Sequence, residues 1–167
     1  MKMKRGQEEI VGFVLIVVLV SVVLMIFLGI YIRKVPNDVS ESRDIHQFLE
    51  SSMEYTTECV TSFYPDYRKV GELFKECLGN DKCLDGANSC DVLNESMVSL
   101  IDSGWLINED SPYKGYIFVS EYEAFENSSR TSILSLSSGS CNGSRKGASY
   151  LTPASPGTIR STLEICS

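Results

Sequence analysis

The sequence predicts an α+β protein: an N-terminal transmembrane helix that continues into an amphipathic helix, then a small helical region and a short antiparallel β-sheet. Three observations predict it. Residues 10–32 carry no charge, and apolar residues then recur every three or four positions as far as residue 103. From residue 115 onward, β-branched and aromatic residues are frequent and turn residues separate them. Helices first and strands after are typical of the α+β class.

The first element is an uncharged run of 23 residues, Ile10–Ile32, rich in Val, Ile and Leu. As a helix it is about 35 Å long, slightly more than a bilayer's hydrocarbon core of about 30 Å. The run is too long for the apolar core of a secretory signal peptide, and no small-residue cleavage site follows it. The alternative, a buried helix of a soluble protein, is disfavoured by the length and the charged flanks. We therefore predict a transmembrane helix over residues 7–34, anchored in the lipid bilayer.

Charge is distributed unevenly along the chain. Residues 1–34 hold five Lys/Arg and two Glu, and the remainder holds ten Lys/Arg and twenty Asp/Glu, so the net charges are +3 and −10. This asymmetry is typical of a basic end at a membrane and a solvated acidic domain. Three cations precede the apolar run and two follow it, which favours a cytoplasmic N-terminus. No basic cluster occurs beyond residue 34, so nucleic acid is not expected as a partner.

Cysteines and sequons indicate that residues 35–167 form a single domain outside the cell. An even number of cysteines in a small exported domain is typical of a disulfide framework. We favour a bond between Cys141 and Cys166, with the other four cysteines stapling the helical loop region. The gaps between Cys77, Cys83 and Cys90 do not match metal knuckles. The six cysteines are Cys59, Cys77, Cys83, Cys90, Cys141 and Cys166, and the candidate N-glycosylation acceptors are Asn94, Asn127 and Asn142.

The entry to the apolar run reads Lys4-Arg5-Gly6-Gln7-Glu8-Glu9. This stretch resembles the class III signal peptides of archaeal type IV pilin-like proteins. The resemblance covers about 30 residues and implies that a prepilin-type peptidase cuts between Gly6 and Gln7. Residues 1–6 are then a basic leader, and the apolar segment stays on the chain as half of a long N-terminal helix. The alternative is an uncleaved signal anchor.

The resemblance also implies contacts between like subunits through this helix. The family pattern has a Glu at the fifth mature residue, which pairs with the N-terminal amine of a neighbouring subunit. Here that position is Val11, and the second and third mature positions are Glu8 and Glu9. These two acids are therefore the candidates for subunit pairing.

Three helices are predicted in the exported part. The first follows Pro36, with a kink there, and its apolar stripe extends to Val60 and Phe63. The second begins at Pro65–Asp66 and ends at Gly79–Asn80. The third covers residues 90–103, with Gly104 as its C-cap and Trp105 and Leu106 tucked under it. The stripe of the first helix consists of Ile45, Phe48, Leu49, Met53, Thr56, Cys59, Val60 and Phe63.

Three or four short antiparallel strands are predicted after these helices. Residues 115–123, 131–137 and 158–166 have strand character, and the last of these places Ile159, Leu163 and Ile165 inward. Asn142-Gly143 is a hairpin turn signal. The Ser/Gly-rich residues 135–149 are predicted to be loop.

Sites for catalysis or metal are not expected. His46 is the sole histidine, which leaves no partner for a Ser-His-Asp site and no second imidazole for zinc. Asp81, Asp85 and Gly86 match part of a calcium loop, but Cys83 and Val92 stand where ligands are needed. No phosphate-binding glycine motif occurs. We expect no enzyme activity and no cofactor.

Two functions are consistent with these features. The first is a membrane-anchored extracellular structural protein, a type IV pilin-like filament subunit or minor pilin of an archaeal cell surface. The alternative is a permanently anchored single-pass surface domain that binds a ligand or another protein and does not polymerise. Both place the N-terminus in the cytoplasm and the C-terminal domain outside, and they differ in cleavage between Gly6 and Gln7.

Overall fold

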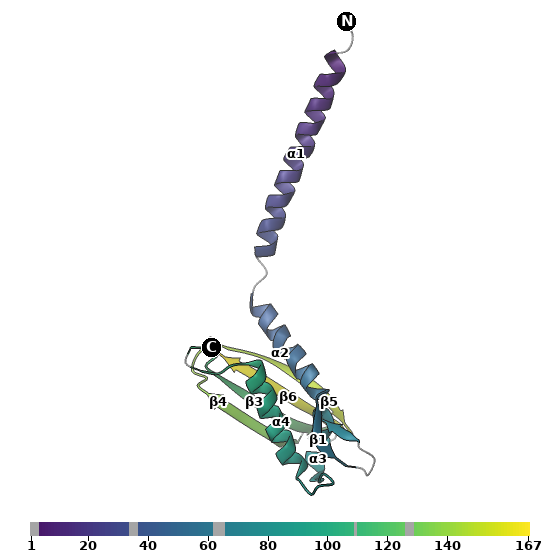
Figure 1. The fold of residues 1–167 in the computed structure, drawn as a ribbon, viewed down its shortest axis with the longest axis vertical. Coiled ribbons are helices and arrows are strands. Elements are labelled where there is room, and N and C mark those ends of the chain that lie inside the picture. The colour runs from purple at the N-terminus through teal and green to yellow at the C-terminus, as the bar shows by residue number, and fades with distance from the viewer. Residues whose placement is uncertain (1–3, 34–36, 62–65, 109, 126–128) are drawn as a thin grey trace. The chain divides into compact units, whose positions relative to one another are not determined.

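The computed structural model describes residues 4–33, 37–61, 66–108, 110–125 and 129–167. It divides into two compact units, Met1–Val39 and Ser40–Ser167. The second is called the C-terminal unit below. Its helices and strands confirm the predicted α+β class, and Figure 1 shows their arrangement.

Helix α1 (Lys4–Arg33) is the predicted apolar helix. Its stretch Gly12–Ile30 has a mean hydropathy of 3.3 and none of it is buried. By length and composition this stretch is able to cross a membrane or to serve in a signal sequence. Its one hydroxyl, on Ser21, donates a hydrogen bond of 2.8 Å to the Val17 carbonyl oxygen, which keeps the polar group satisfied within an apolar surface.

The C-terminal unit is built on a four-stranded antiparallel sheet. Its strands are β3 (Gly115–Ala124), β4 (Arg130–Gly139), β5 (Arg145–Ala154) and β6 (Gly157–Cys166), in the order β4-β3-β6-β5. Side chains alternate between a buried and a solvated face. On β6 the predicted inward residues Ile159, Leu163 and Ile165 are all buried. Phe118, on the central strand β3, lies opposite Leu163 of β6 and Leu136 of β4.

Three helices supply the other half of a single core: α2 (Asn37–Met53), α3 (Val70–Gly79) and α4 (Ser89–Gly104). Apolar residues at three- and four-residue spacing give each helix one buried stripe. The core side chains from α2, α3 and α4 are Ile45, Leu49, Met53, Val70, Leu73, Phe74, Cys77, Leu93, Met97 and Ile101. They cover the face of the sheet that carries Tyr116 and Phe118 (Figure 1).

The prediction that the first exported helix extends to Phe63 is wrong. Helix α2 ends at Met53, where the Ser52 hydroxyl donates a hydrogen bond of 2.7 Å back to the Phe48 carbonyl oxygen. Residues 56–60 instead form strand β1 (Thr56–Val60), and the alternate residues Thr57 and Cys59 are the buried ones. Because Thr56, Cys59 and Val60 fit either period, the sequence pattern did not separate helix from strand there. Pro36 and Phe63 lie outside the described residues.

The start of the second helix is also corrected. Tyr67–Lys69 is strand β2, which pairs antiparallel with β1, and α3 begins only at Val70. The Glu72 carboxylate accepts a hydrogen bond of 3.1 Å from the Lys69 N–H, which satisfies a backbone donor at this helix start. At the other end, Asn80 has φ 57°, a left-handed conformation that ends α3 where predicted.

The prediction of a loop over residues 135–149 is wrong for most of that range. Strand β4 continues to Gly139 and β5 begins at Arg145. Ser137 and Ser149 are exposed, so they belong to strands although they are not apolar. Because β4 and β5 lie at opposite edges of the sheet, Asn142-Gly143 crosses between edges and is not a hairpin turn.

Helix α4 ends differently from the prediction. Gly104 is its last helical residue, and the Trp105 N–H donates to the Ile101 carbonyl oxygen at 2.9 Å. Gly104 is instead a point of close packing, because a Cβ there would lie 3.1 Å from Cε2 of Phe48. Trp105 packs edge-on against Phe48, with 4.6 Å between ring centroids. Leu106 is 70% exposed and does not tuck under the helix.

All six cysteines are in disulfides. The favoured pair, Cys141–Cys166, is confirmed, and it ties the β4–β5 connection to the end of β6. The other four lie in the helical region as expected: the bonds are Cys59–Cys83 and Cys77–Cys90. The second of these joins α3 to α4, so the helical layer is covalently stapled as well as packed.

Candidate functional site

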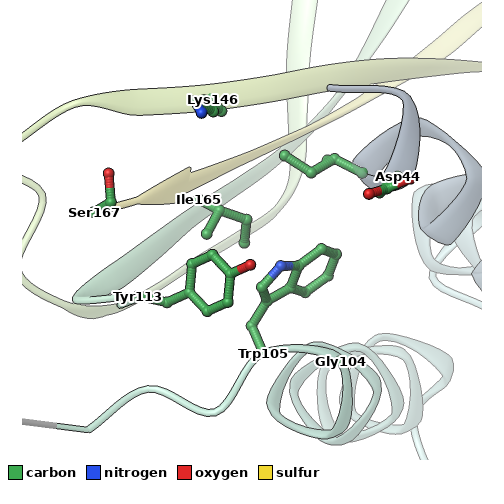
Figure 2. Close-up of a pocket in the computed structure, with 8 residues that line it drawn as sticks. Asp44, Gly104, Trp105, Tyr113, Lys146, Ile165 and Ser167 are labelled. Carbon is green, nitrogen blue, oxygen red and sulfur yellow. The ribbon is translucent and has the colours of Figure 1, made fainter. Parts of the chain in front are cut away.

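A pocket of about 220 Å³ opens in the C-terminal unit, where α2, the end of α4 and the strands β5 and β6 meet (Figure 2). It is small enough to hold one ring-sized group and is bounded by both apolar and charged side chains. The lining residues are Asp44, Ile45, Gly104, Trp105, Tyr113, Lys146, Ile165 and Ser167.

The apolar side of this pocket is aromatic. Trp105 is held by its edge-on contact with Phe48, and Tyr113 follows a turn in which the Asn108 side-chain oxygen accepts a hydrogen bond of 2.7 Å from the Ser111 N–H. Figure 2 shows the Tyr113 hydroxyl directed towards the Trp105 indole, with Ile165 beside them. Ile165 is 4% exposed and closes the pocket towards the core.

Polar groups stand around this aromatic wall. Asp44 comes from α2 and Lys146 from β5, so charges of opposite sign reach the pocket from different elements. The Ser167 hydroxyl is 2.7 Å from that of Ser144, in a hydrogen bond that either can donate. The arrangement is suited to binding a small group that has an apolar face and polar edges.

A second hollow, of about 420 Å³, lies between β1 and α4. It contains three carboxylates, Glu58, Asp85 and Glu95, beside the apolar Tyr55 and Val92. Among the described residues, no group of three or more His, Cys, Asp or Glu side chains is placed to hold a metal ion.

The loop that partly matches a calcium site is a structural turn. The Asp85 carboxylate accepts a hydrogen bond of 2.9 Å from the Ala87 N–H, and Gly86 has φ 87°. Lys82 and Asn88 form a β-bridge across it. The Asn88 side-chain oxygen then accepts from the Cys90 N–H at 2.8 Å and caps α4. Backbone N–H groups therefore occupy one carboxylate oxygen of Asp85 and the side-chain oxygen of Asn88.

A network of ion pairs surrounds Arg68, a side chain that is only partly exposed. Its Nε is 2.8 Å from Oε1 of Glu76, and its Nη1 is 3.4 Å from Oδ2 of Asp66. Burial raises the pKa of the Glu76 carboxyl above its ordinary value, and the nearby Arg68 guanidinium opposes that shift only in part. Burial likewise raises the pKa of Tyr116. The Arg68–Glu76 pair joins β2 to α3, whereas Tyr116 lies on β3. None of these three residues lines either hollow described above.

The residues of the signal-peptide resemblance lie together in α1. Gly6, Gln7, Glu8 and Glu9 all fall within this helix, and their side chains are outside the described part of the structure. Their spacing is therefore that of consecutive residues on a helix, and no further contact is assigned to them.

The three sequons differ in setting. Asn94 is exposed in the first half of α4, within regular helix. Asn142 is exposed in the β4–β5 connection, where its Nδ2 donates a hydrogen bond of 3.0 Å to the Ser140 hydroxyl oxygen. Asn127 lies outside the described residues.

His46 is exposed on α2, and its ring centroid is 6.1 Å from that of Tyr150. The pocket residues Tyr113 and Lys146 were not singled out from the sequence, and Trp105 was expected only to pack. The one feature of the sequence that could have pointed to this pocket is Trp105, because it is the single tryptophan of the chain. The chain matches no protein-family model, no curated protein and no solved structure.

Proposed function

We propose that the chain is a membrane-anchored extracellular structural protein, a type IV pilin-like filament subunit or minor pilin. The observation that carries the proposal is the apolar surface of α1, which is exposed throughout Gly12–Ile30. Burial of apolar surface stabilises by about 25 cal/mol per Å², so a surface of this size is costly in water. A bilayer and a bundle of like helices are both apolar surroundings, so one segment serves in the membrane and in a filament.

The residues before this apolar surface suggest how the helix would pass from the membrane into a filament. Cleavage between Gly6 and Gln7 would remove the basic leader and leave a positive amine on Gln7. Burying that amine unpaired among apolar helices would cost several kcal/mol. Glu8 or Glu9 of an adjacent subunit is the nearest available negative charge, because the apolar run that follows has none.

The first test is the N-terminal mass of the protein extracted from membranes of cells that contain the matching peptidase. We expect the mature chain to begin at Gln7. Chains that keep Met1–Gly6 under these conditions would contradict the proposal and leave the uncleaved anchor.

The second test is a double substitution, Glu8→Gln with Glu9→Gln. We expect this variant to insert and to be cleaved but to form no filaments. The matched control is Glu50→Gln with Glu58→Gln, which removes two exposed carboxylates from the C-terminal unit and should leave assembly unchanged. Normal filaments from the Glu8/Glu9 variant would show that the pairing is not needed.

The second candidate function is a permanently anchored binding domain, and the Trp105–Tyr113 pocket is the observation that favours it. A pocket with an aromatic wall and charges of both signs is suited to a small ligand. Cleavage separates the two candidates. An uncleaved chain that forms no filament, and whose Trp105 fluorescence responds to small cyclic solutes, would favour binding over assembly.

A further inference from the structure

The two edges of the four-stranded sheet are protected to different degrees. Within the described residues, β4 pairs only with β3, and β5 pairs only with β6, so each presents one row of backbone N–H and C=O groups to the surroundings. Unpaired edges are templates for pairing with another strand. Proteins usually block them with Lys or other charged residues, or with Pro. Strand β5 has such protection, because it contains Arg145, Lys146 and Pro153.

Strand β4 has very little of this protection against edge pairing. Its residues 131–138 contain no charge, no proline and no glycine. Its single charge, Arg130, is at the strand's start and lies 3.8 Å from a Glu121 oxygen and 3.9 Å from a Glu123 oxygen. A β-bulge interrupts the pairing with β3 next to Leu134, and from Leu134 to Gly139 the register is regular. This six-residue run is therefore the part of the edge that is able to accept another strand.

The side chains of this run are also suited to a like strand. Leu134 and Leu136 are half-buried at the rim of the core, and Ser135 and Ser137 are exposed on the opposite face. A second copy brings the same alternation of leucine and serine. Because the whole chain has a net charge of −7, two copies repel each other over most of their surface, and the neutral β4 edge is where that repulsion is weak.

We propose that β4 is a self-association edge, where the β4 strands of two copies pair antiparallel about a two-fold axis. We infer the register in which Ser135 lies opposite Ser135, because Leu134 then lies opposite Leu136 twice. Side chains directly opposite in an antiparallel pair point to the same face, so both leucine pairs lie on the core side and the serine pair on the solvated side. The two sheets then form one sheet of eight strands. The inference applies to an anchored chain as well as to a filament subunit.

The main test is a charge-swap series at Ser135 in the full-length protein in detergent micelles, followed by sedimentation. Wild type should form dimers. Ser135→Lys and Ser135→Glu each place two like charges opposite each other, and each should raise the dimer Kd by about five-fold or more. An equimolar mixture of the two variants should recover dimers, because Lys then lies opposite Glu.

The matched control is Ser149→Lys, which adds the same charge at an exposed serine on the protected β5 edge and should leave dimers unchanged. All these variants contain the same α1, so any association through that helix is common to them. Intact disulfides and unchanged circular dichroism in each variant would show that the fold is kept. Cleavage and filament formation are measured separately, so failure here is distinct from failure of the proposed function.

The register has its own test. Opposed residues of an antiparallel pair have Cα atoms about 4.5–5.5 Å apart, which is within disulfide reach. Ser135→Cys should therefore form an intermolecular disulfide under mild oxidation, whereas Ser149→Cys should not. Equal association of wild type, Ser135→Lys and Ser149→Lys, or no cross-link at position 135, would overturn the proposal; a β4 edge that pairs only with a strand of another protein would give that result.

Discussion

The hydroxyls of Ser120 and Ser161 lie 3.1 Å apart inside the C-terminal unit, between the two central strands β3 and β6. Both residues are fully buried, and they are direct partners in the strand register. Either hydroxyl is able to donate the hydrogen bond between them. This pair is a polar site in the middle of an apolar face, where one hydroxyl donates a hydrogen bond and the other accepts it.

We predict a strongly non-additive mutant cycle at this pair. Ser120→Ala or Ser161→Ala alone leaves one buried hydroxyl without its partner and should lower the free energy of unfolding by about 1–3 kcal/mol. The double variant removes both polar groups, so its loss should be smaller than the sum of the single losses. Denaturant unfolding of the disulfide-intact protein measures all three. The exposed pair Ser149 and Thr162, 2.9 Å apart, is the control and should show little coupling; additive losses at the buried pair would contradict the prediction.

Two glycines with positive φ allow the cost of a steric clash to be measured separately from the cost of a left-handed backbone conformation. Gly139 has φ 70°, and a Cβ there would lie 2.1 Å from the Lys114 carbonyl oxygen, whereas Gly86 has φ 87° and open space. Gly86→Ala should therefore cost only about 1–2 kcal/mol, the penalty of a left-handed residue with a Cβ. Gly139→Ala adds a backbone clash and should cost clearly more. Similar losses from both, measured as changes in unfolding free energy, would mean that β4 shifts to make room.

The environment of Glu76 predicts a pH dependence with a definite sign. Burial raises the pKa of this carboxyl in the folded state above its ordinary value of 4.5. The folded chain thus holds that proton more tightly than the unfolded chain, and this site loses stability as pH rises through the window from about 4.5 to the raised value. Glu76→Gln removes the titration. Relative to wild type, the variant should become more stable as pH rises through this window.

Unfolding curves at a series of pH values measure this difference. The control is Glu72→Gln, which removes a more exposed partner of the same Arg68, 3.9 Å from its Nη1. A relative stability of Glu76→Gln that falls with rising pH would mean that the Arg68 ion pair outweighs burial.

The disulfides predict a simple labelling result. Because all six cysteines are paired, alkylation of the denatured, unreduced protein should modify none of them. Replacing Cys141 and Cys166 together with alanine leaves no free thiol and should lower the unfolding free energy by about 2–4 kcal/mol. Several labelled thiols in wild type would instead indicate a reducing compartment and would argue against export.

Much of the fold was predictable because several segments have a hydrophobic period that fits only one kind of secondary structure. Helix α4 was predicted almost to its observed bounds, since its apolar residues have no strand-like alternation. The inward set on β6 was correct because its apolar and polar residues alternate with the period of a strand. The end of α2 was not predictable, because Cys59 and Val60 fit both the helical spacing of the preceding stripe and the spacing of a strand.

The candidate pocket was the least predictable feature. Trp105, Tyr113 and Lys146 come from the end of α4, a turn and strand β5, and no spacing along the chain relates them. They meet because the β4–β5 connection carries the chain from one edge of the sheet to the other.

The sequence by itself determined the apolar helix, the α+β class and the presence of a disulfide framework. These depend on composition and local period, which are properties of short segments. Tertiary structure alone decided that residues 135–149 are mostly strand. Ser135, Ser137 and Ser149 have low strand character, but backbone pairing with β3 and β6 holds them extended while their side chains face solvent. It also decided which strands became the edges, because strand order depends on how distant segments pair.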